Sequence, residues 1–136
     1  MSSNLNTHLA IDRTLCGTVT ALSDGYAKVV LHTSHRMHAD DKGLVHGGFL
    51  FGAADYAAMA AVNDPYVVLG AAQTTFVAPV CVGDTVTFEA TVTARKGKKA
   101  IVDVVGYSRD IKVFEGVFTA FVLDCHVLDR TKQKSL

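Results

Sequence analysis

Residues 49–62 read FLFGAADYAAMAAV, and this stretch decides the fold. It is rich in alanine, the best helix former, and Asn63-Asp64-Pro65 ends it. The predicted helix is apolar almost all round, with Asp55 as its only ionisable carboxylate, so neighbouring elements must cover most of it. At ~1.5 Å per residue it is about 21 Å long, and its alanines and Gly52 allow other elements to approach closely.

Strand-like segments lie on both sides of this helix. Residues 14–22 and 26–33 flank Ser23-Asp24-Gly25, which is a hairpin signal. Four further strands are expected at 67–79, 84–95, 99–108 and 112–125. The clearest alternates apolar and polar residues (TVTFEATVT, 85–93), as in an antiparallel sheet with one buried face. We predict an α+β fold in which an antiparallel sheet wraps around one long central helix. Because one sheet covers only one side, we expect a second copy of the chain to cover the other.

The composition indicates one globular domain. The chain has 136 residues, 49% of them hydrophobic and 19% charged, which fits a single domain at 14–128 with flexible ends at 1–13 and 129–136. Thirteen basic and thirteen acidic residues give no net charge, which argues against a nucleic-acid binder. Three cysteines without a CxxC pair argue against a disulfide scaffold. No signal peptide or membrane span is visible, so we expect a cytoplasmic protein.

Three groups of motifs carry a resemblance to a known family. They are Gly43-Leu44-Val45-His46-Gly47-Gly48 with Asp55, then Thr75-Phe76-Val77-Ala78-Pro79 with Val82-Gly83-Asp84-Thr85-Val86, and Val113-Phe114-Glu115-Gly116. Together they resemble the hotdog-fold acyl-CoA thioesterases of the phenylacetate-pathway type, over about residues 14–125. The resemblance implies a hotdog fold, a homodimer or dimer of dimers, and an acyl-CoA or acyl carrier protein thioester as substrate. It implies no cofactor apart from coenzyme A as part of the substrate.

The residues at the start of the helix suit thioester chemistry. Backbone N–H groups of Gly47 and Gly48 at a helix N-terminus favour negative charge and would stabilise an oxyanion. Asp55, about two turns further on, would activate water or attack the carbonyl itself. A thiolate leaves readily, and no metal is required. Each residue also has a structural interpretation. Asp55 would point to solvent or meet a backbone or interface donor, and the two glycines would only permit tight packing. His46, a further candidate catalytic residue, would be a buried, hydrogen-bonded structural histidine.

One position departs from the family pattern. Where many relatives have an Asn that orients the substrate or catalytic water, this sequence has Asp40, which cannot donate a hydrogen bond when ionised. The layout also resembles the malonyl-CoA-binding effector domain of repressors of fatty-acid synthesis, which have Asn at the position of Asp55. We expect no DNA-binding segment ahead of the domain here. A non-catalytic acyl-CoA sensor is therefore the alternative function, and a structural homodimer is the third. An enoyl-CoA hydratase is disfavoured, because Gly43 replaces the Asn of its D-x-N-x-x-H motif at 41–46.

Polar residues outside the helix are further candidates for substrate binding. Four basic residues cluster at one predicted hairpin tip: Arg95, Lys96, Lys98 and Lys99. The default interpretation of this tip is a solvated turn, and the functional one is contact with coenzyme A phosphates. Gln73 and Thr75 share a strand face and, from the family, are expected to reach the partner's site across a dimer. Three loop histidines (His32, His35 and His38) lack carboxylate or thiolate support, so we predict no metal site.

Overall fold

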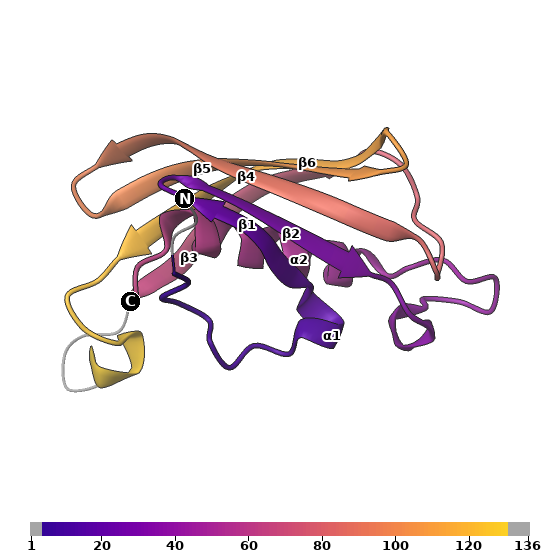
Figure 1. Cartoon of the computed structure of the whole chain (residues 1–136), viewed down its shortest axis with the longest axis horizontal. Coiled ribbons are helices and arrows are strands. Elements are labelled where there is room, and N and C mark those ends of the chain that lie inside the picture. The colour runs from indigo at the N-terminus through magenta and orange to yellow at the C-terminus, as the bar shows by residue number, and fades with distance from the viewer. Residues whose placement is uncertain (1–3, 131–136) are drawn as a thin grey trace.

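The computed structural model describes residues 4–130 and shows a six-stranded antiparallel sheet around one long helix (Figure 1). The strands are β1 (Thr18–Ser23), β2 (Tyr26–His32), β3 (Val67–Phe76), β4 (Thr85–Lys96), β5 (Lys99–Ser108) and β6 (Ile111–Val122). Their order across the sheet is β1-β2-β4-β5-β6-β3, and all neighbours run antiparallel. The predicted α+β architecture is therefore confirmed, and so are the first hairpin and the four later strands, within a few residues at their ends.

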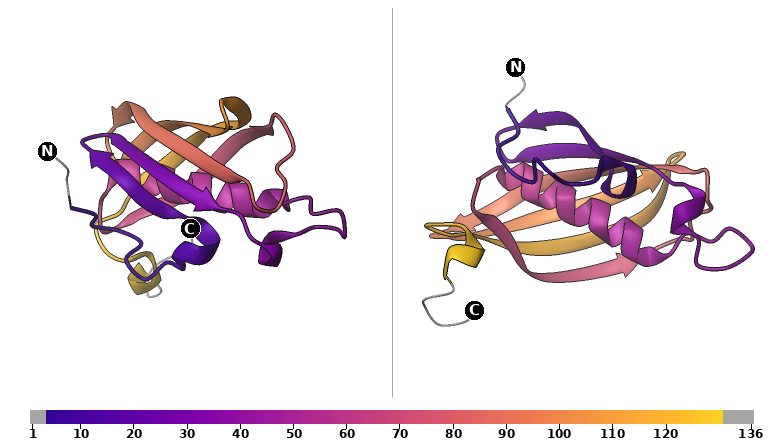
Figure 2. Two further views of the ribbon diagram at one scale, coloured as in Figure 1. Left: turned by 45° about the vertical axis from the view of Figure 1, so that its right-hand side comes forward. Right: turned by 90° about the horizontal axis from the view of Figure 1, so that it is seen from below.

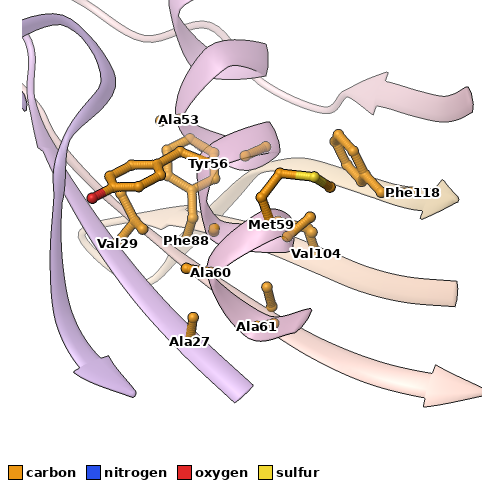
Figure 3. Packing of buried hydrophobic residues seen from close by; sticks show 14 of the residues in the cluster. Ala27, Val29, Ala53, Tyr56, Met59, Ala60, Ala61, Phe88, Val104 and Phe118 are labelled. Carbon is orange, nitrogen blue, oxygen red and sulfur yellow. The ribbon is translucent and has the colours of Figure 1, made fainter. Parts of the chain in front are cut away.

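The long helix, α2 (Gly47–Val62), lies across one face of the sheet (Figure 2). Ten of its 16 residues are buried, as its apolar sequence requires. Figure 3 shows Tyr56 and Met59 leaving the helix on different sides, the first toward Val29 of β2 and the second toward Phe118 of β6. The helix begins two residues before the predicted start at residue 49. Glycine is a poor helix former, so composition alone places the start too late.

The chain before β1 differs from the prediction. Residues 14–16, predicted to begin a strand, belong to the short helix α1 (Arg13–Cys16), and β1 starts only at Thr18. The carboxylate of Asp12 caps α1 by accepting the N–H of Thr14 at 2.9 Å. Gly17 then ends the helix with a φ of 91°, and a Cβ there would lie 2.6 Å from the side chain of Val29. The turn between α1 and β1 therefore requires glycine.

An N-terminal segment, residues 4–12, packs against the C-terminal end of α2. Asn63 ends the helix in the left-handed conformation (φ 57°), and its side chain accepts the N–H of Asn6 at 2.7 Å and donates to the carbonyl of Asn4 at 2.8 Å. The ring of His8 stacks on that of Tyr56. The predicted flexible lead at 1–13 thus makes specific contacts from Asn4 onward.

The predicted tail at 129–136 is described only in part. Its first two residues belong to a 3-10 turn, Val127–Arg130, and residues 131–136 lie outside the described part of the chain, as do residues 1–3. Between residues 4 and 130, no helix is both long and apolar enough to cross a membrane.

Strand β3 forms one edge of the sheet. It pairs with β6 along its whole length, from Val67 opposite Val122 to Phe76 opposite Phe114. Within residues 4–130 no strand pairs with its other side, and residues 70–73 are exposed. A bulge between Leu69 and Ala71 shifts the register by one residue. A ten-residue strand with a free edge is a template for pairing with another strand.

Candidate functional site

The loop that leads into α2 is anchored on both sides. The N–H of Val45 donates to the carbonyl of Val80 and that of His46 to the carbonyl of Met37, both at 2.8 Å. The exposed carboxylate of Asp40 accepts the N–H groups of Lys42 at 2.9 Å and Leu44 at 3.1 Å. The structure therefore gives Asp40, predicted to bind substrate, a role in shaping this loop. The loop in turn fixes where α2 begins.

The first turn of α2 presents two free backbone donors. Gly47 and Gly48 are its first residues, and among residues 4–130 neither N–H is hydrogen-bonded. A Cβ at Gly47 would lie 3.1 Å from the ring of Phe76, and one at Gly48 would lie 3.2 Å from the ring of His46. Both glycines are therefore closely approached by aromatic rings, and their N–H groups are free to bind an anion. The interpretation that the glycines permit tight packing and the interpretation that they bind an oxyanion are thus compatible.

Asp55 lies two turns further along α2 and is held in an unusual environment. Its Oδ1 atom is buried and has no hydrogen-bond partner within the described residues. Burial raises the pKa of Asp55 from its ordinary value of 3.8 to about 6. A Cβ at Gly52, one turn earlier on the helix, would meet nothing within 4 Å. A desolvated carboxylate of this kind is suited to accept a proton near neutral pH.

His46 precedes the helix and is exposed. Its ring covers Gly48 and meets the ring of Phe49 edge-on, with centroids 6.2 Å apart. It makes no side-chain hydrogen bond within residues 4–130. The alternative of a buried, hydrogen-bonded structural histidine is therefore wrong, and both ring nitrogens are available to a ligand.

An apolar groove of about 360 Å³ opens beside the free amides. It is lined by Leu44, Val45, Gly47 and Leu50 and by the segment from Phe76 to Val80. Ligand pockets commonly range from ~300 to ~1,000 Å³, so this groove is large enough for a small apolar group. Sequence reasoning singled out Thr75 and missed Phe76, although the contact with Gly47 makes Phe76 part of the site.

Gln73 and Thr75 do not belong to this groove. They pair with Val117 and Glu115 of β6, and together with Asp103 they line a separate hollow of about 340 Å³. Residues on β5 that face α2 are buried, whereas Asp103 is exposed, so this hollow is on the outer face of the sheet. Within one chain they are therefore separate from the start of α2, and the expectation that they reach the partner's site across a dimer stays a prediction.

The basic hairpin also lies far from the groove within one chain. Its residues Arg95, Lys96, Lys98 and Lys99 join β4 to β5. Lys99 pairs with Phe121, which is next to the partner of Val67 at the beginning of β3, whereas the groove lies at the end of β3. Ten strand residues span ~33 Å. Lys98 is also engaged, because its Nζ is 2.7 Å from a carboxylate oxygen of Asp124.

The loop histidines do not converge. His32 contacts the hydroxyl of Thr85, while the rings of His35 and His38 stack 4.2 Å apart. In the described part of the chain, no three His, Cys, Asp or Glu residues are grouped as a metal would require. The three cysteines are free thiols.

Comparisons with known proteins place this geometry in a family. The sequence pattern of the thioesterase superfamily matches residues 42–115, more than half of the chain. The crystal structure of protein PH1136 from Pyrococcus horikoshii, described as uncharacterised, is 48% identical, with a TM-score of 0.94 over 95% of this chain and 99% of that one.

Two more distant structures share the fold alone. PaaI from the phenylacetic acid degradation operon of Escherichia coli is 23% identical, with a TM-score of 0.75 over 84% of each chain. A hypothetical thioesterase from Streptococcus pneumoniae, solved with coenzyme A, is 18% identical, with a TM-score of 0.72 over 80% of this chain and 87% of that one.

One curated protein matches strongly over a part of its length. Methylthioribose-1-phosphate isomerase of Aquifex aeolicus is 51% identical over 122 residues, which cover 89% of this chain and 27% of that protein. The chain thus spans about a quarter of the length of that relative. The family pattern, the high similarity to PH1136 and the sheet wrapped around α2 agree, and the chain belongs to the thioesterase superfamily with its hotdog fold.

Proposed function

We propose that this protein hydrolyses acyl-CoA thioesters to the free acid and coenzyme A. The observation that carries the proposal is Asp55, whose Oδ1 atom is buried without a partner on a helix that begins with two free amides. An unpartnered buried carboxylate costs stability, so its presence calls for a functional reason. The apolar groove beside the amides supplies a place for the acyl group.

The thioester carbonyl would bind at the start of α2. Its oxygen would accept hydrogen bonds from the N–H groups of Gly47 and Gly48, which become stronger as negative charge develops on that oxygen. Asp55 would remove a proton from a water molecule, and the water oxygen would form the new bond to the carbonyl carbon. The tetrahedral intermediate then expels the thiolate, which takes up a proton. The exposed ring of His46 is placed over Gly48, where it would contact the substrate.

The spacing of these groups favours a general base over direct attack within one subunit. Seven residues separate Gly48 from Asp55, which corresponds to about 10 Å of helix rise. Reacting atoms must approach to about 3–3.5 Å, so this separation excludes direct attack by Asp55 on a carbonyl bound at Gly48 of the same subunit. A nucleophilic Asp55 would have to come from a second subunit.

A homodimer through the free edge of β3 would complete the site. Antiparallel pairing of two β3 strands places the beginning of each strand beside the end of the other. The partner's basic hairpin, which contains Arg95, Lys96 and Lys99, would then lie at the same end as the groove. There it would contact the phosphates of coenzyme A. The S. pneumoniae protein of the same fold, which was solved with coenzyme A, supports this choice of carrier.

The test is thiol release from a panel of short, medium, long and aryl acyl-CoAs, measured for the native protein and for Asp55→Asn. We expect Asp55→Asn to lower kcat by at least about 100-fold, the usual contribution of a general base. Calorimetric titration with the same compounds should show that binding is retained. Asp103→Asn is the matched control, since Asp103 is an exposed carboxylate on the outer face of the sheet.

The competing function is an acyl-CoA sensor without chemistry. It is favoured by Asp40, because this carboxylate is engaged with the backbone of its own loop and is not free to orient a water molecule. Saturable binding without thiol release in either protein would overturn the hydrolase and establish the sensor. Neither binding nor release would contradict both.

A further inference from the structure

The N-terminal segment lies along α2 as a strap that few contacts hold. Figures 1 and 2 show it on the face of the sheet where α2 lies. Within the described part of the chain, the hydrogen bonds from residues 4–11 to other elements all go to the side chain of Asn63. Leu5 and Ile11 add apolar contacts with the core, and both are only partly buried. A segment held in this way can leave the helix while the sheet stays folded.

His8 fixes the middle of this segment on α2. Its ring stacks on that of Tyr56, with centroids 6.1 Å apart and 26° between the planes. Its Nδ1 atom is 2.7 Å from the hydroxyl of Thr7, which is buried. The backbone of His8 has a φ of 55°, a left-handed conformation that residues with a Cβ rarely adopt. The contacts of the ring therefore hold the chain in a shape that the free segment would not keep.

The surroundings of His8 offer nothing that would stabilise a positive charge on its ring. The half-buried ring lines a pocket of about 220 Å³, whose other titratable residues are Tyr66, just before β3, and His126, just before the 3-10 turn. Among the described residues that line this pocket, none is a carboxylate. The Nδ1 atom of His126 accepts the N–H of Leu128 at 3.0 Å, so this second imidazole is held in place beside the pocket. A positive charge on His126 would repel one on His8.

The carboxylates on the neighbouring elements do not change this. Asp64 and Asp129 are not among the lining residues, and Asp64 accepts the N–H of Tyr66 at 2.8 Å.

The stacking partner of His8 does little more for a charged ring. A cation is attracted to the face of an aromatic ring within ~6 Å, and the stack with Tyr56 is at that limit. Burial raises the pKa of Tyr56, and the positive charge of Arg13 in α1 opposes this, so a cation already acts on the same tyrosine. Burial accordingly lowers the pKa of His8 below its ordinary value of 6.5.

We propose that His8 is a pH-dependent switch, in which protonation of its ring releases residues 4–11 from α2 and uncovers Tyr56. The released segment binds the proton more tightly than the docked one, so docking is strongest above about pH 7 and weakens as the pH falls below about 6.5. The capped helix α1 and Gly17 follow the segment and mark where the movement ends. This inference goes beyond the proposed function and does not depend on it.

Hydrogen exchange of the full chain at pH 7.5 and pH 5.0, followed by mass spectrometry, tests the release. The exchange rate of residues 4–11 is divided by that of an unstructured peptide of the same sequence at the same pH, which removes the intrinsic effect of pH. We expect the protection of this segment to fall several-fold, by at most about tenfold for each pH unit below 6.5. The protection of residues 85–95 in β4 should not change, and unchanged protection of residues 4–11 would overturn the proposal.

Two variants show which imidazole is responsible. His8→Asn keeps a residue that tolerates the left-handed conformation and removes the titrating ring, so its protection should be the same at both pH values. His126→Asn is the matched control, because it removes the other imidazole of the pocket, and it should keep the native dependence on pH. The opposite pattern in the two variants would assign the switch to His126 and refute the role of His8.

A measurement on the native protein covers the case in which His8→Asn never docks. The ring of His8 is titrated by NMR in the protein and in a peptide of residues 4–12. We expect the ring to titrate at a lower pH in the protein, because only the docked segment disfavours the proton. Titration at the same pH in both would mean that docking and protonation are not coupled, and the proposal would fail.

Discussion

The two ends of α2 differ in whether their polar groups are hydrogen-bonded within the chain. At the C-terminal end, Asn63 closes the helix, and its side chain bonds twice to the N-terminal segment. At the N-terminal end, the amides of Gly47 and Gly48 have no partner within the described residues, and two turns later Asp55 keeps one oxygen buried and unpaired. One end of the helix is built for stability, and the other keeps its hydrogen-bonding capacity for something outside the chain.

This contrast locates the site better than the motif alone. Folding favours structures in which buried polar groups are paired, and exceptions collect where a ligand completes the pairing. In α2 the exceptions lie between its first and ninth residues, and the apolar groove opens beside the first of them. The well-capped half provides the stability that the other half lacks.

The largest expected effect comes from removing the unpaired buried carboxylate of Asp55. The folded protein holds the proton of Asp55 more tightly (pKa about 6) than the unfolded chain does (3.8). Stability therefore falls as the pH rises from about 4 to about 6, and the full cost, at most about 3 kcal/mol, is present above pH 7. Asp55→Asn should raise the free energy of unfolding by up to this amount at pH 8 and by much less at pH 4.5.

Urea unfolding at the two pH values measures this difference. Asp103→Asn, in which an exposed carboxylate is replaced, should show no such dependence on pH. Equal stabilisation by Asp55→Asn at both pH values would show that burial does not raise the pKa of this carboxyl group.

The next effect comes from removing the side-chain hydrogen bonds of Asn63 at the C-terminal end of α2. Asn63→Ala removes both side-chain hydrogen bonds and places alanine in the left-handed conformation, which asparagine tolerates better. It should therefore lower the free energy of unfolding by about 1–2 kcal/mol. Asn63→Gly keeps the backbone conformation and loses only the two side-chain bonds, so it should lower stability less. Thermal unfolding compares the two variants. Thiol release well below the melting temperature should stay at the native level, and a large loss there would mean that the two halves of α2 are not independent.

A smaller effect concerns the protonation state of Asp55 during catalysis. With Asp55 as the base, kcat/KM should fall about tenfold per pH unit below about pH 6 and be level above it. The measurement is a pH–rate profile from pH 4.5 to 8.5 with one acyl-CoA. A flat profile through this range would exclude Asp55 as the group that accepts the proton.

The smallest effect is expected at the ion pair between Lys98 and Asp124, beyond the paired end of α2. Their side chains are 59% and 85% exposed, so water and salt screen the attraction between them. Lys98→Ala should leave the melting temperature unchanged. A clear decrease would indicate that the basic hairpin is part of the stable end of the molecule.

The fold was largely predictable because its signals are local. The alanine-rich run at 49–62 and the alternation at 85–93 each fix an element without knowledge of its neighbours. The start of β1 was predicted wrongly because the capping aspartate Asp12 and Gly17 define a helix of only four residues. Such a short helix has too few residues to show a period.

The site was predictable in part. Gly47, Gly48 and Asp55 stand out in sequence because they interrupt or begin an apolar helix, and the structure gives each of them an unpartnered polar group. The side to which Gln73 and Thr75 point was not predictable. The bulge between Leu69 and Ala71 reverses which residues of β3 point outward, and it is a property of the pairing with β6.

The position of β3 at the edge of the sheet also has a consequence for how the chain folds during synthesis. The strand follows α2 directly, yet its partner β6 is the last strand of the chain. Phe76 therefore cannot pair until Phe114 has been synthesised, and Val67 cannot pair until Val122 has been. Until β6 has left the ribosome, the apolar helix has only an incomplete sheet to pack against. Folding is therefore completed late and depends on pairings between distant residues, which are slow to form. A nascent chain stopped before Val122 would expose α2, and we expect chaperones to bind it at that stage.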